Sequence, residues 1–164
     1  MQTDVDKRIA PVPVIVGVFL QKSQVPREIL NGAHCPRPMA RRRHELMWLL
    51  QRLTYLGLNQ IGAVVGGLDP TTVRAGIGAV SDRMGFDPNL RQRLLEIEAA
   101  CFAESGSLLA EARKVVGSGI PLSGRSMAVT VLGVASVLAS PHLTDAEARR
   151  AALDLIERNS EVRT

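Results

Sequence analysis

Residues 57–84 read GLNQIGAVVGGLDPTTVRAGIGAVSDRM, and this stretch predicts two helices joined by a tight turn. The first helix is expected at 58–65 and ends at Gly66-Gly67, because paired glycines adopt the positive φ angles of a tight turn at little steric cost. The second helix is expected to begin with Asp69 as its N-cap and Pro70 at its first position, where the missing N–H is no loss. Together they form a helix-turn-helix pattern.

The second predicted helix has two distinct faces. Its apolar positions recur at spacings of four, three and four residues, which indicates a buried stripe of Val73, Ile77, Val80 and Met84. The opposite face is small, polar and positively charged, and it contains Thr71, Thr72, Arg74, Ala75, Gly78 and Ser81. Such a face suits a helix in the major groove of a duplex, where its N-terminal residues meet phosphates or base edges.

A family resemblance accompanies this pattern. Residues 66–73, GGLDPTTV, resemble the GGRDHTTV signature of the DNA-binding domain of the DnaA family, the bacterial chromosomal replication initiators. Arg41-Arg42-Arg43, the segment 46–54 and then Leu58 and Ile61-Gly62 resemble the same domain in order and spacing. The resemblance extends over residues 12–100 and implies the all-α DNA-binding domain of that family, without its ATPase.

The resemblance also implies roles for individual residues. In that family an arginine at the position of Arg41 enters the minor groove, the first residues of the recognition helix read bases, and the second threonine contacts phosphate. These roles would fall on Arg41, Asp69, Thr71 and Thr72. Two positions depart from the family pattern, since Leu68 replaces an arginine and Pro70 replaces a base-reading histidine. Proline has no side-chain hydrogen-bonding group, so the preferred DNA sequence is expected to differ from the initiator's.

The basic residues gather just ahead of the helix-turn-helix. The formal charge of +4 is a modest bias, but five arginines lie within residues 37–52 against the single acid Glu45: Arg37, Arg41, Arg42, Arg43 and Arg52. We expect Arg37, Arg42 and Arg43 to hold phosphates and Arg74 to reach bases. Arg41–Arg43 are expected in the first turn of a helix at 39–56, where cations oppose the helix dipole and an anionic partner would relieve the conflict.

The composition predicts packed helices, because 46% of residues are hydrophobic but only 3% are aromatic. The expected organisation is a flexible leader at 1–11, a DNA-binding domain at 12–104 and a C-terminal helical interaction domain at 105–164, with the boundary in a polar seam at 104–107. The β-branched stretch 14–20 would suit a buried strand, but the resemblance favours a helix, followed by a short helix at 26–30 and a loop at 31–38.

The C-terminal part is expected to contain several further helices. Asp87-Pro88 starts a helix that extends to about residue 103, and a short one follows at 108–117. A turn at 121–125 precedes a helix at 127–138 that is apolar nearly all round, and Thr144 with Glu147 forms a capping box for the last helix. The inward residues of the last helix are expected to be Ala148, Ala151, Ala152, Leu155 and Ile156. A core of this size is marginal, so these helices are expected to pack on the first domain, on a second copy or on a partner.

No catalytic or cofactor-binding constellation is found in the sequence. It has no glycine-rich phosphate loop, no cofactor motif and no catalytic dyad, so an enzyme is not expected. His34, Cys35 and His44 lack a fourth ligand with paired spacing, so no metal site is expected either. The apolar runs are too short to span a membrane, and a cytoplasmic location is the default.

The leading hypothesis is a sequence-specific double-stranded DNA-binding protein that acts as a transcription regulator, namely an activator. DnaA-like readers without the ATPase also occur in activators of gene transfer agents and phage-like gene clusters, and this chain resembles that arrangement. The C-terminal helices would then contact RNA polymerase, a sigma-like partner or a second copy in a homodimer. The alternatives are a protein-interaction adaptor that has lost DNA reading and a competitor for the initiator's own sites.

Overall fold

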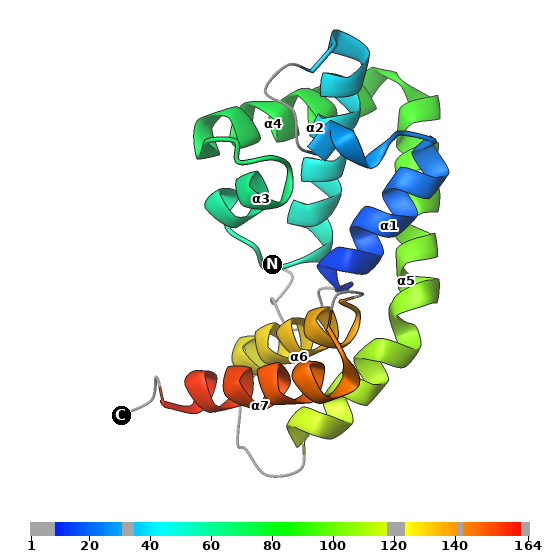
Figure 1. Cartoon of the computed structure of the whole chain (residues 1–164). Coiled ribbons are helices and arrows are strands. Elements are labelled where there is room, and N and C mark those ends of the chain that lie inside the picture. The colour runs from blue at the N-terminus through cyan, green and yellow to red at the C-terminus, as the bar shows by residue number, and fades with distance from the viewer. Residues whose placement is uncertain (1–8, 31–34, 118–123, 141–142, 162–164) are drawn as a thin grey trace. The chain divides into compact units, whose positions relative to one another are not determined.

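The computed structural model describes residues 9–30, 35–117, 124–140 and 143–161, and every regular element in these ranges is helical. This confirms the all-α fold class. Figure 1 shows the elements in chain order, and their bounds are α1 Val12–Ser23, the 3₁₀ helix η2 Arg27–Leu30, α2 Arg37–Leu53, α3 Leu58–Val64, α4 Pro70–Phe86, α5 Pro88–Gly117, α6 Gly124–Leu138 and α7 Asp145–Glu161.

The chain divides into two compact units. Ile15–Cys101 forms the N-terminal unit, while Met1–Val14 and Phe102–Thr164 contribute their described residues to the C-terminal unit. Most of the expected leader at 1–11 lies outside the described residues, but its last members Ile9, Ala10 and Pro11 are buried.

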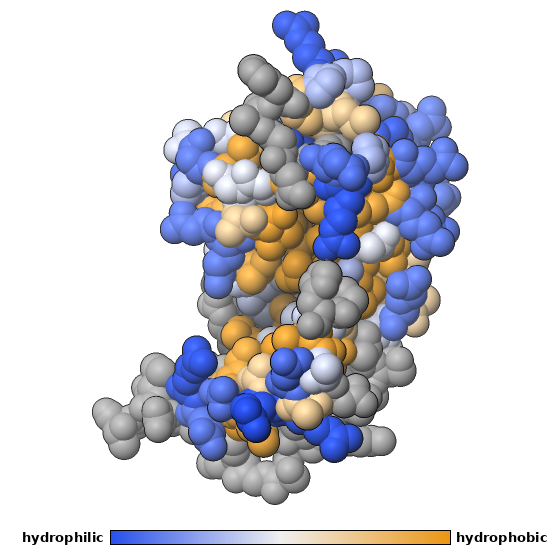
Figure 2. Space-filling view, in the orientation of Figure 1, coloured by the Kyte–Doolittle hydropathy of each residue, from blue (hydrophilic) through white to orange (hydrophobic). Residues whose placement is uncertain are grey.

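The N-terminal unit has an aliphatic core formed by α1 to α4 and the first part of α5. Phe19, Leu46, Leu50, Ile61 and Leu94 are fully buried in it. Figure 2 shows hydrophobic residues in the central part of the viewed face of this unit and hydrophilic residues around them. Burial of each such side chain contributes about 1.5–3 kcal/mol relative to exposure, so apolar packing holds α3 and α4 in place.

The stretch 14–20 is helical, as the resemblance implied. It lies in α1, where Ile15, Val16, Val18 and Phe19 are buried. The β-branched residues of this helix therefore pack in the core of the N-terminal unit, and their burial outweighs the weak strand propensity of the sequence. The short second helix is also present, as η2.

The bounds of α2 correct two expectations. The helix begins at Arg37, inside the loop expected at 31–38, because Pro38 lies in the first turn, where proline needs no intrahelical N–H partner. It ends at Leu53 and not at residue 56, since the Thr54 hydroxyl donates to the Leu50 carbonyl and accepts from the Leu56 N–H. Gly57, expected to close this helix, is instead the N-cap of α3. Residues 31–34 of the expected loop lie outside the described residues.

The polar seam expected at 104–107 is helical. Asp87 caps α5 as predicted, accepting from the Leu90 N–H at 3.0 Å, but the helix continues without a break to Gly117. The segment contains no proline, and the single Gly106 costs a helix only about 1 kcal/mol. The separate helix expected at 108–117 is therefore the last part of α5, and the division between the two units falls inside this helix.

The C-terminal unit is built on the packing of α6 against α7. Its buried cluster consists of Ala112, Val131, Val134, Ala135, Ala152 and Ile156. The capping box of α7 is confirmed, because the Glu147 carboxylate accepts from the Thr144 N–H at 2.9 Å and from its hydroxyl at 2.8 Å. These bonds lower the pKa of Glu147. Of the expected inward residues, Ala148, Ala152 and Ile156 are buried, and Ala151 and Leu155 are half-buried. Residues 121–123 of the turn expected at 121–125 lie outside the described residues, but 124 and 125 are helical, because α6 begins at Gly124 and not at residue 127.

Candidate nucleic-acid interface

The turn between α3 and α4 is fixed by glycines. Gly66 and Gly67 have φ angles of 103° and 76°, as the sequence predicted. The Gly62 carbonyl accepts hydrogen bonds from Gly67 N–H at 2.8 Å and Leu68 N–H at 3.1 Å. A Cβ on Gly62 would lie 2.0 Å from the Leu68 carbonyl oxygen, so only glycine allows the chain to fold back this closely.

The start of α4 is held by Asp69, which is its N-cap as expected. One carboxylate oxygen accepts from the backbone N–H groups of Thr71 and Thr72, at 2.9 and 3.0 Å. The other accepts from the Thr72 hydroxyl. The bonds to Thr72, followed by the one to Thr71, lower the pKa of Asp69. Both oxygens of Asp69 and the single hydroxyl donor of Thr72 are thus engaged within the turn itself.

The two faces of α4 agree with the sequence pattern. Val73, Ile77 and Val80 are buried, and Met84 is partly buried. Every residue expected on the outward face is exposed, namely Thr71, Thr72, Arg74, Ala75, Gly78 and Ser81. Thr71 and Arg74 therefore project from the first two turns of a helix whose inner face is firmly packed.

Gly76 brings α4 close to α2. A Cβ at this position would lie 2.8 Å from His44 Cδ2 and 3.0 Å from Met47 Sδ. Burial, followed by the positive charges of Arg83 and Arg43, lowers the pKa of His44, and only Glu45 opposes this. His44 is therefore neutral at pH 7 and packs as an apolar group at the crossing of the two helices.

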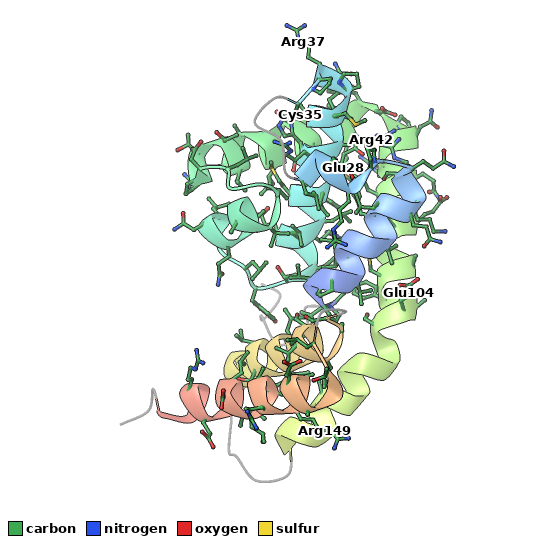
Figure 3. All side chains as sticks on the ribbon, in the orientation of Figure 1. Glu28, Cys35, Arg37, Arg42, Glu104 and Arg149 are labelled. Carbon is green, nitrogen blue, oxygen red and sulfur yellow. The ribbon has the colours of Figure 1, made fainter. Side chains whose placement is uncertain are left out.

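Arg37 and Arg41 lie on the exposed side of the first two turns of α2. Figure 3 shows the Arg37 side chain extending away from the beginning of the helix. Within the part of the chain that the structure describes, neither guanidinium forms an ion pair. Arg41–Arg43 occupy the second turn of α2 and not the first, since the helix begins at Arg37; the cation in the first turn is Arg37 itself.

The neighbouring arginines have other surroundings. Arg43 has only 5% of its surface exposed, so its side chain does not reach a duplex in this conformation. Arg42 pairs with Glu45, with 2.9 Å between Nη1 and Oε2. Of the arginines expected to hold phosphates, Arg43 is therefore buried apart from the exposed Arg37.

Glu45 organises a cluster that the sequence pattern did not reveal. Its carboxylate is 1% exposed and forms ion pairs with Arg42, with Arg83 of α4 at 3.1 Å and with Arg93 of α5 at 2.9 Å. The only hint in the sequence was that Glu45 stands alone among five arginines between residues 37 and 52. Its partners Arg83 and Arg93 lie far along the chain, where no periodicity could identify them.

The described residues contain no group of three or more metal-ligating side chains. Their helices include none with the length and apolar character needed to cross a membrane. His34, one of the three residues considered for a metal site, lies outside the described residues.

Comparison with known proteins gives one informative similarity. No family model and no solved structure matches the chain. A 97-residue stretch, 59% of the chain, is 32% identical to the chromosomal replication initiator protein DnaA of Roseiflexus castenholzii. The match spans about a fifth of the length of that initiator. A large part of this chain is thus similar in sequence to one portion of a replication initiator.

Proposed function

We propose that this protein binds double-stranded DNA in a sequence-specific manner through a helix-turn-helix formed by α3 and α4. The opening turn of α4 would enter the major groove, and Arg41 would enter the adjacent minor groove. The observation that supports this most directly is the exposed polar face of α4, whose first turn is fixed from within by Asp69 and the glycine turn. A preorganised surface loses little conformational entropy on binding.

Individual roles follow from the geometry of each side chain. Thr71 and Arg74 are exposed and would contact base edges, and Arg37 would contact the phosphate backbone. Asp69 and Thr72 would act mainly by positioning the turn, because their polar atoms already bond to each other and to the backbone. Arg43 is buried and has no place in the proposed interface.

The proposed biological role is transcription regulation, with activation as the favoured output. The 164 residues contain no glycine-rich phosphate loop of the kind that an ATPase of the initiator type requires. The C-terminal unit would contact RNA polymerase, a sigma-like partner or a second copy, and the protein would act in the cytoplasm.

A selection from random duplexes followed by fluorescence anisotropy tests the proposal. Thr71→Ala, Arg74→Ala and Arg41→Ala should lower affinity for the selected sequence by about 1–3 kcal/mol each and reduce its preference over a scrambled duplex. Arg37→Ala should weaken binding to both duplexes and reduce the salt slope by about 1. Arg149→Ala, an exposed charge on α7, is the matched control.

A protein-interaction adaptor is the second candidate. It is favoured by Leu68 and Pro70, which place apolar side chains where the DnaA signature has an arginine and a histidine. Negligible binding of the wild-type protein to any duplex, even at 20 mM salt where phosphate contacts are strongest, would favour the adaptor. Preference for the initiator's own site over all selected sequences would point instead to competition at replication origins.

A further inference from the structure

The N-terminal unit contains a cavity of about 440 Å³ surrounded by arginines. It lies where the beginning of α2, the end of α4 and the beginning of α5 meet. Five arginines and a buried glutamate are among the residues that line it: Arg37, Arg41, Arg42, Arg83, Arg93 and Glu45. Only Arg37, Arg41 and Arg42 come from the basic cluster of the sequence.

The charge of this cavity is unbalanced. Its lining includes five arginines but only two acids, Glu45 and Asp87, so three positive charges are in excess. The Glu45 carboxylate is shared among three guanidiniums. Asp87 is also engaged as the cap of α5, where it accepts the Leu90 N–H. Among the described residues, neither acid forms an ion pair with Arg37 or Arg41.

The cavity also has more hydrogen-bond donors than acceptors. Each guanidinium has five N–H donors, and Arg42, Arg83 and Arg93 each reach Glu45 through a single nitrogen. The Nε of Arg93 is buried and, among the described residues, has no acceptor. Because Arg42, Arg83 and Arg93 each use one nitrogen toward Glu45, other N–H donors of these guanidiniums remain for a ligand with several acceptor oxygens.

We propose that the cavity binds a phosphate group. Arginine forks match the oxygens of phosphate in geometry and charge, and Glu45 holds three of them in place before the ligand arrives. A volume of about 440 Å³ is within the range of small-ligand sites. The inference does not rest on duplex binding, because the phosphate of a small molecule has the same chemistry as that of a nucleic acid backbone.

Inorganic phosphate is the simplest probe. In a phosphate-free buffer at constant pH, sodium phosphate should raise the melting temperature of the full-length protein more than sodium chloride of equal ionic strength. Arg93→Gln, which removes one of the arginines that line the cavity, should weaken the apparent affinity for phosphate about tenfold, as expected for loss of a charge-assisted hydrogen bond. Arg149→Gln removes the same charge outside the cavity and should leave the phosphate response unchanged.

Arg37→Gln provides a variant that keeps the Glu45 ion pairs. Arg37 lines the cavity but is exposed, so its replacement should not impair folding, and it should still weaken phosphate binding several-fold. Equal effects of phosphate and chloride on the wild-type protein would overturn the proposal. So would a phosphate response of Arg37→Gln and Arg93→Gln that equals that of Arg149→Gln.

A competition experiment separates the two sources of phosphate. If the cavity holds a backbone phosphate, inorganic phosphate should displace a bound duplex more strongly than chloride at equal ionic strength. If it holds a free or nucleotide phosphate, duplex affinity should not change beyond the ionic-strength effect while the phosphate-induced melting shift persists. Because the melting shift is measured without DNA, a protein that binds phosphate but no duplex would refute the proposed function and leave this site intact.

Discussion

Replacement of Gly62 by alanine tests whether close packing of the turn sets the position of α4. The new Cβ would lie 2.0 Å from the Leu68 carbonyl oxygen and 3.1 Å from its carbon, far inside ordinary van der Waals contact. These are backbone atoms, so no side-chain rotation can relieve the clash. The turn would have to open and stretch or break the two hydrogen bonds that the Gly62 carbonyl accepts from Gly67 and Leu68.

The magnitude follows from three terms. Overpacking costs about 1–3 kcal/mol, and each lost backbone hydrogen bond costs about 1 kcal/mol. The greater helix propensity of alanine offsets about 1 kcal/mol of this destabilisation. The net loss is about 2–4 kcal/mol, which would lower the melting temperature by at least about 8 °C in a domain of this size.

Urea unfolding followed by the fluorescence of Trp48 is a suitable assay, because this single tryptophan lies in α2 of the N-terminal unit. Gly17→Ala is the matched control: Gly17 is an exposed glycine of α1 whose Cβ would have nothing within 4 Å, so the substitution should stabilise by about 0.5–1 kcal/mol. Duplex affinity should fall with Gly62→Ala if α4 moves. An unfolding midpoint for Gly62→Ala at or above that of the wild type would show that the turn does not depend on this contact.

Three further substitutions test the electrostatics of the N-terminal unit. Glu45→Gln should destabilise by about 2–3 kcal/mol, less than for a fully buried pair because its arginine partners are 26–35% exposed, and an unchanged urea midpoint would contradict this. Asp69→Ala should lower the melting temperature and weaken binding to all duplexes alike, whereas a selective loss at one base pair would make Asp69 a base reader. The pKa of His44 is lowered in the folded state, mainly by burial, so the unfolded chain binds its proton more tightly. The contribution of His44 to the free energy of unfolding should therefore be fully present above about pH 6.5 and decrease as the pH falls below it. His44→Gln should make the free energy of unfolding, measured by urea titration, depend less on pH between pH 7 and 5.5.

Several features of the fold could be predicted because they depend on neighbours within a few residues. The positive φ angles of Gly66 and Gly67, the Asp69 cap and the Thr144–Glu147 capping box all concern groups at most three positions apart. The buried stripe of α4 follows from helix periodicity in the same way. The expected ends of α2 and the expected break in the middle of α5 were wrong. Residues such as Pro38 and Gly106 often end a helix, but here they lie within one.

The candidate site, in contrast, depends on contacts between residues that are far apart in the chain. The sequence placed Arg37, Arg41, Arg42 and Arg43 in one basic cluster, but only the packed helices decide that Arg43 is buried and that Arg37 and Arg41 remain exposed. Glu45 meets Arg83 and Arg93 across 38 and 48 residues of chain. Local chemistry thus determined the turn, the caps and the polar face of α4, whereas the arginine cavity was decided by tertiary structure, because hydrophobic burial of α2, α4 and α5 brings charges together that no short-range pattern relates.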